Sequence, residues 1–297
     1  MLRFISTFTN SANLQISSKA LYRGTQRILL LLLHDFPEYL SEYYTTFCDV
    51  IPSTCVQLRN LILSAFPRRI TNLPDPFSIS IDIESMPQSQ IIPTISSDYL
   101  SILQTNGLID EINEINEINI NKLTNEIINK ITINENPNHE KGENKYEISL
   151  INSIILVVGI KSISIMEPGK IKFDEESIQV KFIHNLLKNL DGEGRYYVIS
   201  AIANQLRYPS AHTYWFNKLF VYILTSSNDN IIEILTRVLL ERLLVTKPHP
   251  WGLLLTFSNI FSNVAFKPHQ QKFASIAPEF ATVFESVEKS FIRVVEN

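Results

Sequence analysis

Helical spacing of apolar residues, repeated at a nearly constant interval, dominates the second half of the chain. Between Ser177 and Pro250 the expected helix starts lie about 16 to 21 residues apart, so a helix pair recurs about every 35 to 40 residues. The alternation of apolar and polar residues that marks a half-buried strand does not compete with this spacing. The sequence therefore predicts an all-α protein of HEAT-like helical-hairpin repeats, an α-solenoid.

Proline, capping residues and glycine suggest where these helices begin. Asn230 with Glu233 three residues later has the spacing of a capping box, and proline is expected in the first turn after Pro250 and Pro278. The expected starts lie near Glu147, Ser177, Glu193, Ala211, Ile231, Pro250 and Pro278.

Two helices are also expected near the beginning of the chain. The first opens at Pro37 and places Phe36, Leu40, Tyr43 and Phe47 on one face. The second extends over residues 53–66 and is stopped by proline. The linker 50–52 between them is short enough to require a helical hairpin.

The middle of the chain lacks the regular helical pattern of the two ends. Recurrent proline predicts an irregular connector with a short helix over residues 67–106. Residues 107–146 contain a Glu-Ile-Asn repeat whose isoleucines, three apart, would wind around a helix, followed by a polar tail rich in Asn, Glu and Lys. We expect 107–146 to be a low-complexity, disordered insertion that contributes little to the core. Residues 1–66 and 147–297 are then expected to pack together as one domain.

Charge and cysteine content exclude several classes of protein. The formal net charge is -4, with acidic and basic residues interspersed, which predicts neither direct nucleic-acid binding nor membrane binding. The apolar stretch Ile148 to Met166 is broken by polar residues and is expected to be a buried core helix. Two cysteines cannot staple a chain of this size, so we expect the cytosol or the nucleus as its compartment.

No catalytic or metal-binding template fits the chain. Gly192 and Gly194 lie between expected helices and not after a strand, so they predict a turn and no phosphate cradle. Cys48 and Cys55 are better interpreted as free core cysteines than as metal ligands or nucleophiles. We therefore expect no catalytic residue, no metal and no cofactor.

Long blocks of sequence resemble a known family. The blocks closely resemble the C-terminal domain of the Not-one scaffold subunit of the Ccr-Not mRNA deadenylase complex. They are LYRGT at residues 21–25, LLLHDFPEYL at 31–40, FCDVIP at 47–52, QLRNLILSAFP at 57–67, LPDPF at 73–77, EGRY at 193–196, AIANQLRYP at 201–209, RVLLERL at 237–243 and PHPWG at 248–252.

The resemblance implies a non-catalytic scaffold. In that family the domain docks the Not-two and Not-three/five subunits and receives short peptide motifs of mRNA-bound repressors, in the service of deadenylation, mRNA decay and translational repression. Cytoplasm and nucleus are the implied locations. The family domain extends further upstream, so a fragment of a longer scaffold and a separate docking piece both remain open. A free-standing HEAT-type adaptor or transport receptor is the alternative.

Two tyrosines are the candidate partner contacts. On one helix over residues 36–47 the aromatic and apolar residues cover an arc of about 140°, broader than a minimal buried stripe, and Tyr39 and Tyr44 lie at its rims. Tyrosine suits such a half-wet position because its hydroxyl still needs a hydrogen-bond partner. The other interpretation is that neighbouring repeats bury the whole arc. Trp251, at an expected helix start, is predicted to be a core anchor.

Overall fold

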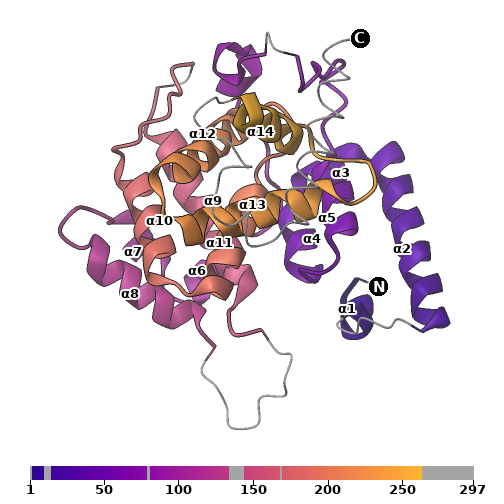
Figure 1. The fold of residues 1–297 in the computed structure, drawn as a ribbon, viewed down its shortest axis with the longest axis horizontal. Coiled ribbons are helices and arrows are strands. Elements are labelled where there is room, and N and C mark those ends of the chain that lie inside the picture. Colours follow the sequence, from indigo (N-terminus) through magenta and orange to yellow (C-terminus); the bar gives the residue numbers. More distant parts are fainter. Residues whose placement is uncertain (1, 10–14, 79–80, 134–143, 168, 263–297) are drawn as a thin grey trace.

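The computed structural model describes residues 2–9, 15–78, 81–133, 144–167 and 169–262, and the prediction of a helix near Pro278 lies outside them. This part of the chain is helical and holds no β-strand apart from one isolated bridge between Thr132 and Tyr146 (Figure 1). The helical fold class is confirmed. The helices are α1 (Leu2–Thr9), α2 (Ile16–Asp35), α3 (Pro37–Glu42), α4 (Tyr44–Val50), α5 (Val56–Leu63), α6 (Ser101–Thr105), α7 (Ile109–Asn113), α8 (Ile120–Ile131), α9 (Ile148–Ser164), α10 (Ile178–Asn189), α11 (Gly192–Ala203), α12 (Ala211–Ser226), α13 (Asp229–Leu243) and α14 (Trp251–Ser262), with 3-10 turns η1 (Ile83–Ser85) and η2 (Pro87–Gln90).

Helices α1 to α5 form an N-terminal unit around a small core of its own. Its fully buried members include Leu40, Leu58, Leu61 and Ile62. The expected single helix over 36–47 is instead two helices, because the chain leaves helical geometry at Tyr43 (φ -100°, ψ 13°). The buried positions nevertheless keep helical spacing across this break: they are Pro37, Leu40, Ser41, Tyr44, Thr45 and Cys48.

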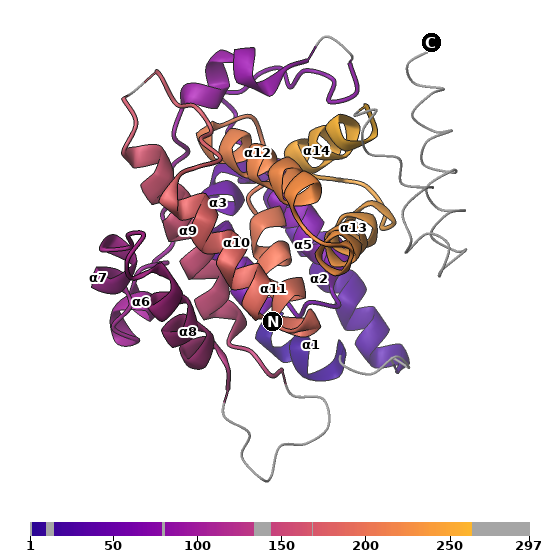
Figure 2. The same cartoon turned by 60° about the vertical axis from the view of Figure 1, so that its left-hand side comes forward.

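The second and larger core is built around α9. This helix is buried on most of its circumference and contacts α4, α6, α8, α10, α11 and α12 (Figure 2). Consecutive helices from α9 to α13 contact one another, which is consistent with a solenoid-like array. The prediction that Ile148 to Met166 forms a buried core helix is confirmed. In the described part of the chain, no helix combines the length and the apolar character needed to cross a bilayer.

The prediction of a disordered insertion is wrong for the described residues of 107–146. Helix α8 packs on α9 and α10. It buries one stripe at helical spacing, formed by Ile120, Leu123, Ile127 and Ile131. This stripe begins after the Glu-Ile-Asn repeat, so the spacing of isoleucines in the repeat does not predict whether α8 is buried. Residues 134–143 lie outside the described part.

The repeat itself is not one helix. Helix α7 ends at Asn113, and the Asn116 side chain then accepts hydrogen bonds from the backbone N–H groups of Ile118 and Asn119, both at 3.0 Å. This turn separates the isoleucines. Ile112 is fully buried, whereas Ile118 is 97% exposed, so the assumed drift of a continuous helix does not apply.

The N-cap of α13 also differs from expectation. Asn228, not Asn230, caps the helix by accepting a hydrogen bond from the Ile231 N–H at 3.1 Å. Glu233 pairs instead with Arg237 one turn later, at 2.5 Å. Glu233 could have formed either a capping box or an ion pair within the helix, and the structure shows the ion pair.

Gly252 allows the start of α14 to lie directly on the loop before α12. Its N–H donates to the Arg207 carbonyl oxygen at 2.5 Å. A β-carbon at this position would lie 2.5 Å from Thr213 Cγ2 and 2.8 Å from the Leu206 carbonyl carbon. Since the second of these neighbours is backbone, it cannot rotate away.

We expect Gly252→Ala to lower the free energy of unfolding by about 1 to 3 kcal/mol, as overpacking does. The matched control is Gly24→Ala in α2, where an added β-carbon meets nothing within 4 Å. It should raise stability by about 0.5 to 1 kcal/mol through helix propensity. Urea unfolding monitored by circular dichroism measures both. Equal stabilities of the two variants would contradict the close approach at Gly252.

Candidate partner-binding surface

An aromatic cluster lies exposed on the N-terminal unit where α3 meets α4. We call Phe36, Tyr39, Tyr43 and Phe47 the aromatic cluster. The Tyr39 ring lies 5.0 Å from the Tyr43 ring and 5.9 Å, edge on, from the Phe47 ring. Phe36 is 61% exposed, Tyr39 48% and Tyr43 37%. Pre-packed aromatic side chains that remain half in water are typical anchors of protein interfaces.

Pro37 and the helical spacing of the buried residues in α3 and α4 produce this exposure. Proline fixes the start of α3, so that Leu40 points into the N-terminal core and is fully buried. Tyr39, one residue earlier, is then directed outward. Tyr39 is therefore exposed, and its role as a partner contact stays a prediction.

Tyr44, the second candidate, is not on the surface. It is 1% exposed, and its hydroxyl donates a hydrogen bond to Gln205 Oε1 at 2.6 Å. The Arg207 guanidinium lies over its ring at 3.7 Å from the centroid, and burial raises the pKa of Tyr44 above its usual range. The prediction that Tyr44 forms an exposed rim is wrong, because Tyr44 continues the buried stripe of Leu40 and Ser41 at helical spacing, and this stripe faces the C-terminal helices.

Tyr44 belongs to a buried polar seam that joins the N-terminal unit to the C-terminal array. Across this seam Arg207 Nη1 donates to the Ser41 carbonyl oxygen and Asn60 Nδ2 to the Arg242 carbonyl oxygen, both at 2.6 Å. Such directional bonds, unlike apolar contact, define one relative placement of the two parts. The seam therefore holds α3, and with it the aromatic cluster, in a fixed position.

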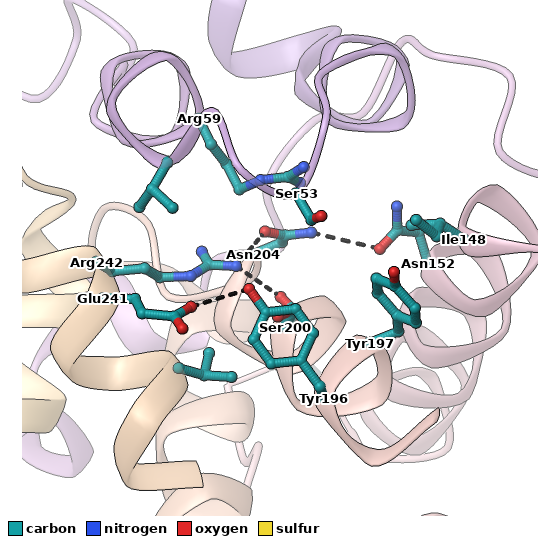
Figure 3. Close-up of a pocket in the computed structure, with 12 residues that line it drawn as sticks. Ser53, Arg59, Ile148, Asn152, Tyr196, Tyr197, Ser200, Asn204, Glu241 and Arg242 are labelled. Carbon is teal, nitrogen blue, oxygen red and sulfur yellow. Dashed lines mark hydrogen bonds between the residues drawn. The ribbon is translucent and has the colours of Figure 1, made fainter. Parts of the chain in front are cut away.

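The side chain of Arg242 lies next to the seam, beside a small cavity whose lining residues Figure 3 shows. Its Nη2 donates to Asn204 Oδ1 at 2.7 Å and to the Ser200 carbonyl oxygen at 2.9 Å. Burial, reinforced by the charge of nearby Arg59, lowers the pKa of Arg242 to about 10. The side chain thus stays protonated at neutral pH, held by neutral acceptors from α11.

The cavity beside Arg242 is too small for a substrate. Its volume is about 20 Å³, which accommodates one water molecule. At its edge the Tyr196 hydroxyl donates to Glu241 Oε2 at 2.9 Å, and burial raises the pKa of this tyrosine to about 12. The tyrosine therefore stays protonated at neutral pH, and its bond to Glu241 suits a structural joint better than proton transfer.

Cys48 and His212 are also buried. Burial raises the pKa of the Cys48 thiol and lowers that of His212 to about 3, so both are neutral at physiological pH. Within the described ranges, no group of three or more His, Cys, Asp and Glu side chains is arranged to hold a metal ion.

A groove of about 290 Å³ lies between the connector and the loop that precedes α12. Apolar residues of both segments line it together with polar ones, namely Arg69, Thr71, Asn72, Gln88 and Ser210. The apolar lining comprises Ile70, Ile91, Pro93, Tyr208 and Pro209. The sequence did not reveal this groove, because the two segments that form it lie more than a hundred residues apart.

An all-helical array that fixes an exposed aromatic cluster through a buried seam is the architecture of a HEAT-like scaffold. The family model described as "CCR4-Not complex component, Not1" matches residues 1–288. The chain belongs to this Not1 scaffold family, and the resemblance seen in the sequence is confirmed.

Two curated relatives are similar to most of this chain. The chain is 37% identical over 304 residues to the CCR4-NOT transcription complex subunit let-711 of Caenorhabditis elegans, and the match covers 98% of this chain and 11% of the relative. It is 32% identical over 282 residues to the general negative regulator of transcription subunit 1 of Schizosaccharomyces pombe, covering 91% of this chain and 13% of the relative. The chain thus spans a small part of the length of these relatives.

Solved structures share the fold. The NOT1 superfamily homology domain from Chaetomium thermophilum superposes with a TM-score of 0.87 at 25% identity, covering 98% of this chain and 58% of that chain. A structure described as the Not1 C-terminal domain in complex with Not4 superposes with a TM-score of 0.76 at 28% identity, covering 86% of this chain and 54% of that chain.

Proposed function

We propose that this domain is a non-catalytic docking platform of the CCR4-Not complex, in the cytoplasm and the nucleus, which binds Not-two, Not-three/five and Not4 in support of mRNA deadenylation, decay and translational repression. Membership of the Not1 family supports this proposal, as does the neighbouring Not1 C-terminal domain that is described in complex with Not4. The exposed aromatic cluster is the observation that carries it.

Tyr39 is the proposed anchor within the cluster. Its ring is already packed against Tyr43 and Phe47, so a partner would immobilise few additional rotatable bonds on binding. Its backbone belongs to α3, which the seam holds in place through the bond from Arg207 to the Ser41 carbonyl oxygen. A rigid aromatic side chain on a rigid helix favours a specific contact.

We expect Tyr39→Ala to weaken binding of at least one of the three subunits about tenfold or more, while the melting temperature stays unchanged. The physical reason is that a half-exposed ring contributes more to an interface than to the fold. Isothermal titration calorimetry with the recombinant subunits measures the affinity, and calorimetric unfolding measures the stability.

Tyr44→Phe is the matched control for that experiment. It removes only the hydroxyl that bonds Gln205 and should lower stability by about 1 to 2 kcal/mol without changing affinity. Loss of binding in the Tyr44 variant and not in the Tyr39 variant would assign the contact to another surface.

The groove beside the connector is the proposed place for short repressor motifs. Its volume is near the lower end of the range of small-ligand pockets, about 300 Å³, so it suits one or two apolar side chains of a peptide. A free-standing adaptor or transport receptor, the alternative function, would use other partners. Failure of all three subunits to bind the wild-type chain would favour that alternative.

A further inference from the structure

The N-terminal part of the chain has a charge opposite to that of the whole. The first 34 residues contain Arg3, Lys19, Arg23 and Arg27 and no acidic residue, although the formal net charge of the chain is -4. Three of these four side chains belong to α2. The remainder of the chain is correspondingly more acidic, so the charges are segregated.

Helix α2 collects these charges on its outer face. At about 100° per residue, Lys19, Arg23 and Arg27 fall within an arc of about 80°, on the side of the helix away from the buried residues Thr25 and Leu29. All three are exposed. Leu30 and Leu31, 42% and 61% exposed, continue the same face toward the end of the helix. We call these five outward residues the α2 face. Both views show α2 at the edge of the molecule, on the side away from α8 (Figures 1 and 2).

The three cations lack ion-pair partners within the described part of the chain. None of them forms an ion pair with a described carboxylate, and the first turn of α2 holds no acidic residue. Lys19 and Arg23, like Arg23 and Arg27, are like charges four residues apart, which destabilises a helix by about 0.2 to 0.5 kcal/mol per pair. Lys19, in the first turn, also opposes the helix dipole.

We infer that the α2 face is a docking site for an acidic amphipathic helix of a partner subunit, with carboxylates at four-residue spacing beside leucine-like side chains. This inference rests on the proposed docking function and adds the chemistry of one partner segment. Three cations in line match carboxylates on one side of a helix, while Leu30 and Leu31 require apolar cover. RNA fits less well, because the face contains no aromatic side chain on which a base could stack.

The test reverses the charges and keeps the fold. R23E/R27E should weaken the binding of at least one of Not-two, Not-three/five and Not4 about tenfold or more, with a larger effect at low salt, since close charge pairs across an interface are screened by ions. The control is K172E/K188E, which alters the net charge equally through two exposed lysines on other elements. It should change affinity less than about twofold. Melting temperatures of both variants verify folding.

A chemical cross-link identifies the partner groups directly. Carbodiimide joins a carboxylate to a lysine amine only when the two are in contact, so mass spectrometry should find an amide between Lys19 and an Asp or Glu of the bound subunit. A labelled oligo(A) RNA of twenty nucleotides serves as the second probe.

The outcomes separate the two proposals. If no subunit binds the wild-type chain, the docking function itself fails. If the subunits bind wild type and R23E/R27E equally, the function stands and the α2 face is not the site. RNA binding that is lost in R23E/R27E while subunit binding is unchanged would overturn the acidic partner in favour of nucleic acid.

Discussion

Trp251→Ala should lower the free energy of unfolding by about 3 to 5 kcal/mol, because it removes a large aromatic side chain from a packed site. The indole is 6% exposed at the start of α14, and its Nε1 donates to the Pro74 carbonyl oxygen at 2.7 Å. The ring therefore fastens the irregular connector to the helical array. The prediction that Trp251 is a core anchor is borne out by its burial.

Trp251→Phe separates the contribution of the buried ring from that of its hydrogen bond to the Pro74 carbonyl oxygen. It retains much of the apolar volume but leaves the Pro74 carbonyl without its donor, so a loss of about 1 to 3 kcal/mol is expected. Chemical denaturation of both variants, with subunit binding measured alongside, checks this. A Trp251→Ala protein as stable as wild type that no longer binds a subunit would identify the indole as an interface residue.

Ile127→Ala should lower stability by about 2 to 5 kcal/mol through loss of buried apolar surface and formation of a cavity. Ile127 lies in the middle of the buried stripe of α8 and is fully enclosed. Ile118→Ala, in the turn before α8, is the matched control. Since that side chain is 97% exposed, its removal should change stability by less than about 0.5 kcal/mol.

This pair of variants tests whether residues 107–133 are part of the fold. Thermal unfolding by differential scanning calorimetry gives both values in one experiment. Equal stabilities of the two proteins would restore the earlier expectation of a dispensable insertion.

Local patterns were sufficient to predict most of the C-terminal array. The starts expected near Ser177, Glu193 and Ala211 agree with α10, α11 and α12 within a residue or two. The boundaries follow from residues adjacent in sequence, such as Ser210, whose hydroxyl accepts from the Thr213 N–H. Such boundaries can be predicted from sequence because the capping residue and the backbone group that it bonds are only a few residues apart.

Tyr44 shows what local patterns could not predict. The arc of aromatic and apolar residues placed it on a rim, but Tyr44 belongs to the buried stripe of α3 and α4, and its partner, Gln205, lies 161 residues away. Likewise Asn60 bonds a carbonyl 182 residues away. Periodicity indicates which side of a helix is buried, but it does not indicate which distant polar groups form hydrogen bonds with the polar side chains on that side.

The seam has a thermodynamic consequence for the docking surfaces. Arg207 and Arg242 are buried and hydrogen-bonded mainly to neutral oxygen atoms. Removing such a side chain leaves its acceptor oxygen atoms without a donor. Moving the N-terminal unit relative to the C-terminal array would break several hydrogen bonds at once. The aromatic cluster and the α2 face are thus carried by a unit with one defined placement on the array.

Affinity purification of the tagged chain, with quantitative mass spectrometry of the co-purifying proteins, tests the docking function most directly. The expected result is enrichment of Not-two, Not-three/five and Not4 with the wild-type chain, and loss of at least one of them with Tyr39→Ala. Recovery of unrelated cargo or adaptor proteins, without any CCR4-Not subunit, would contradict the docking function.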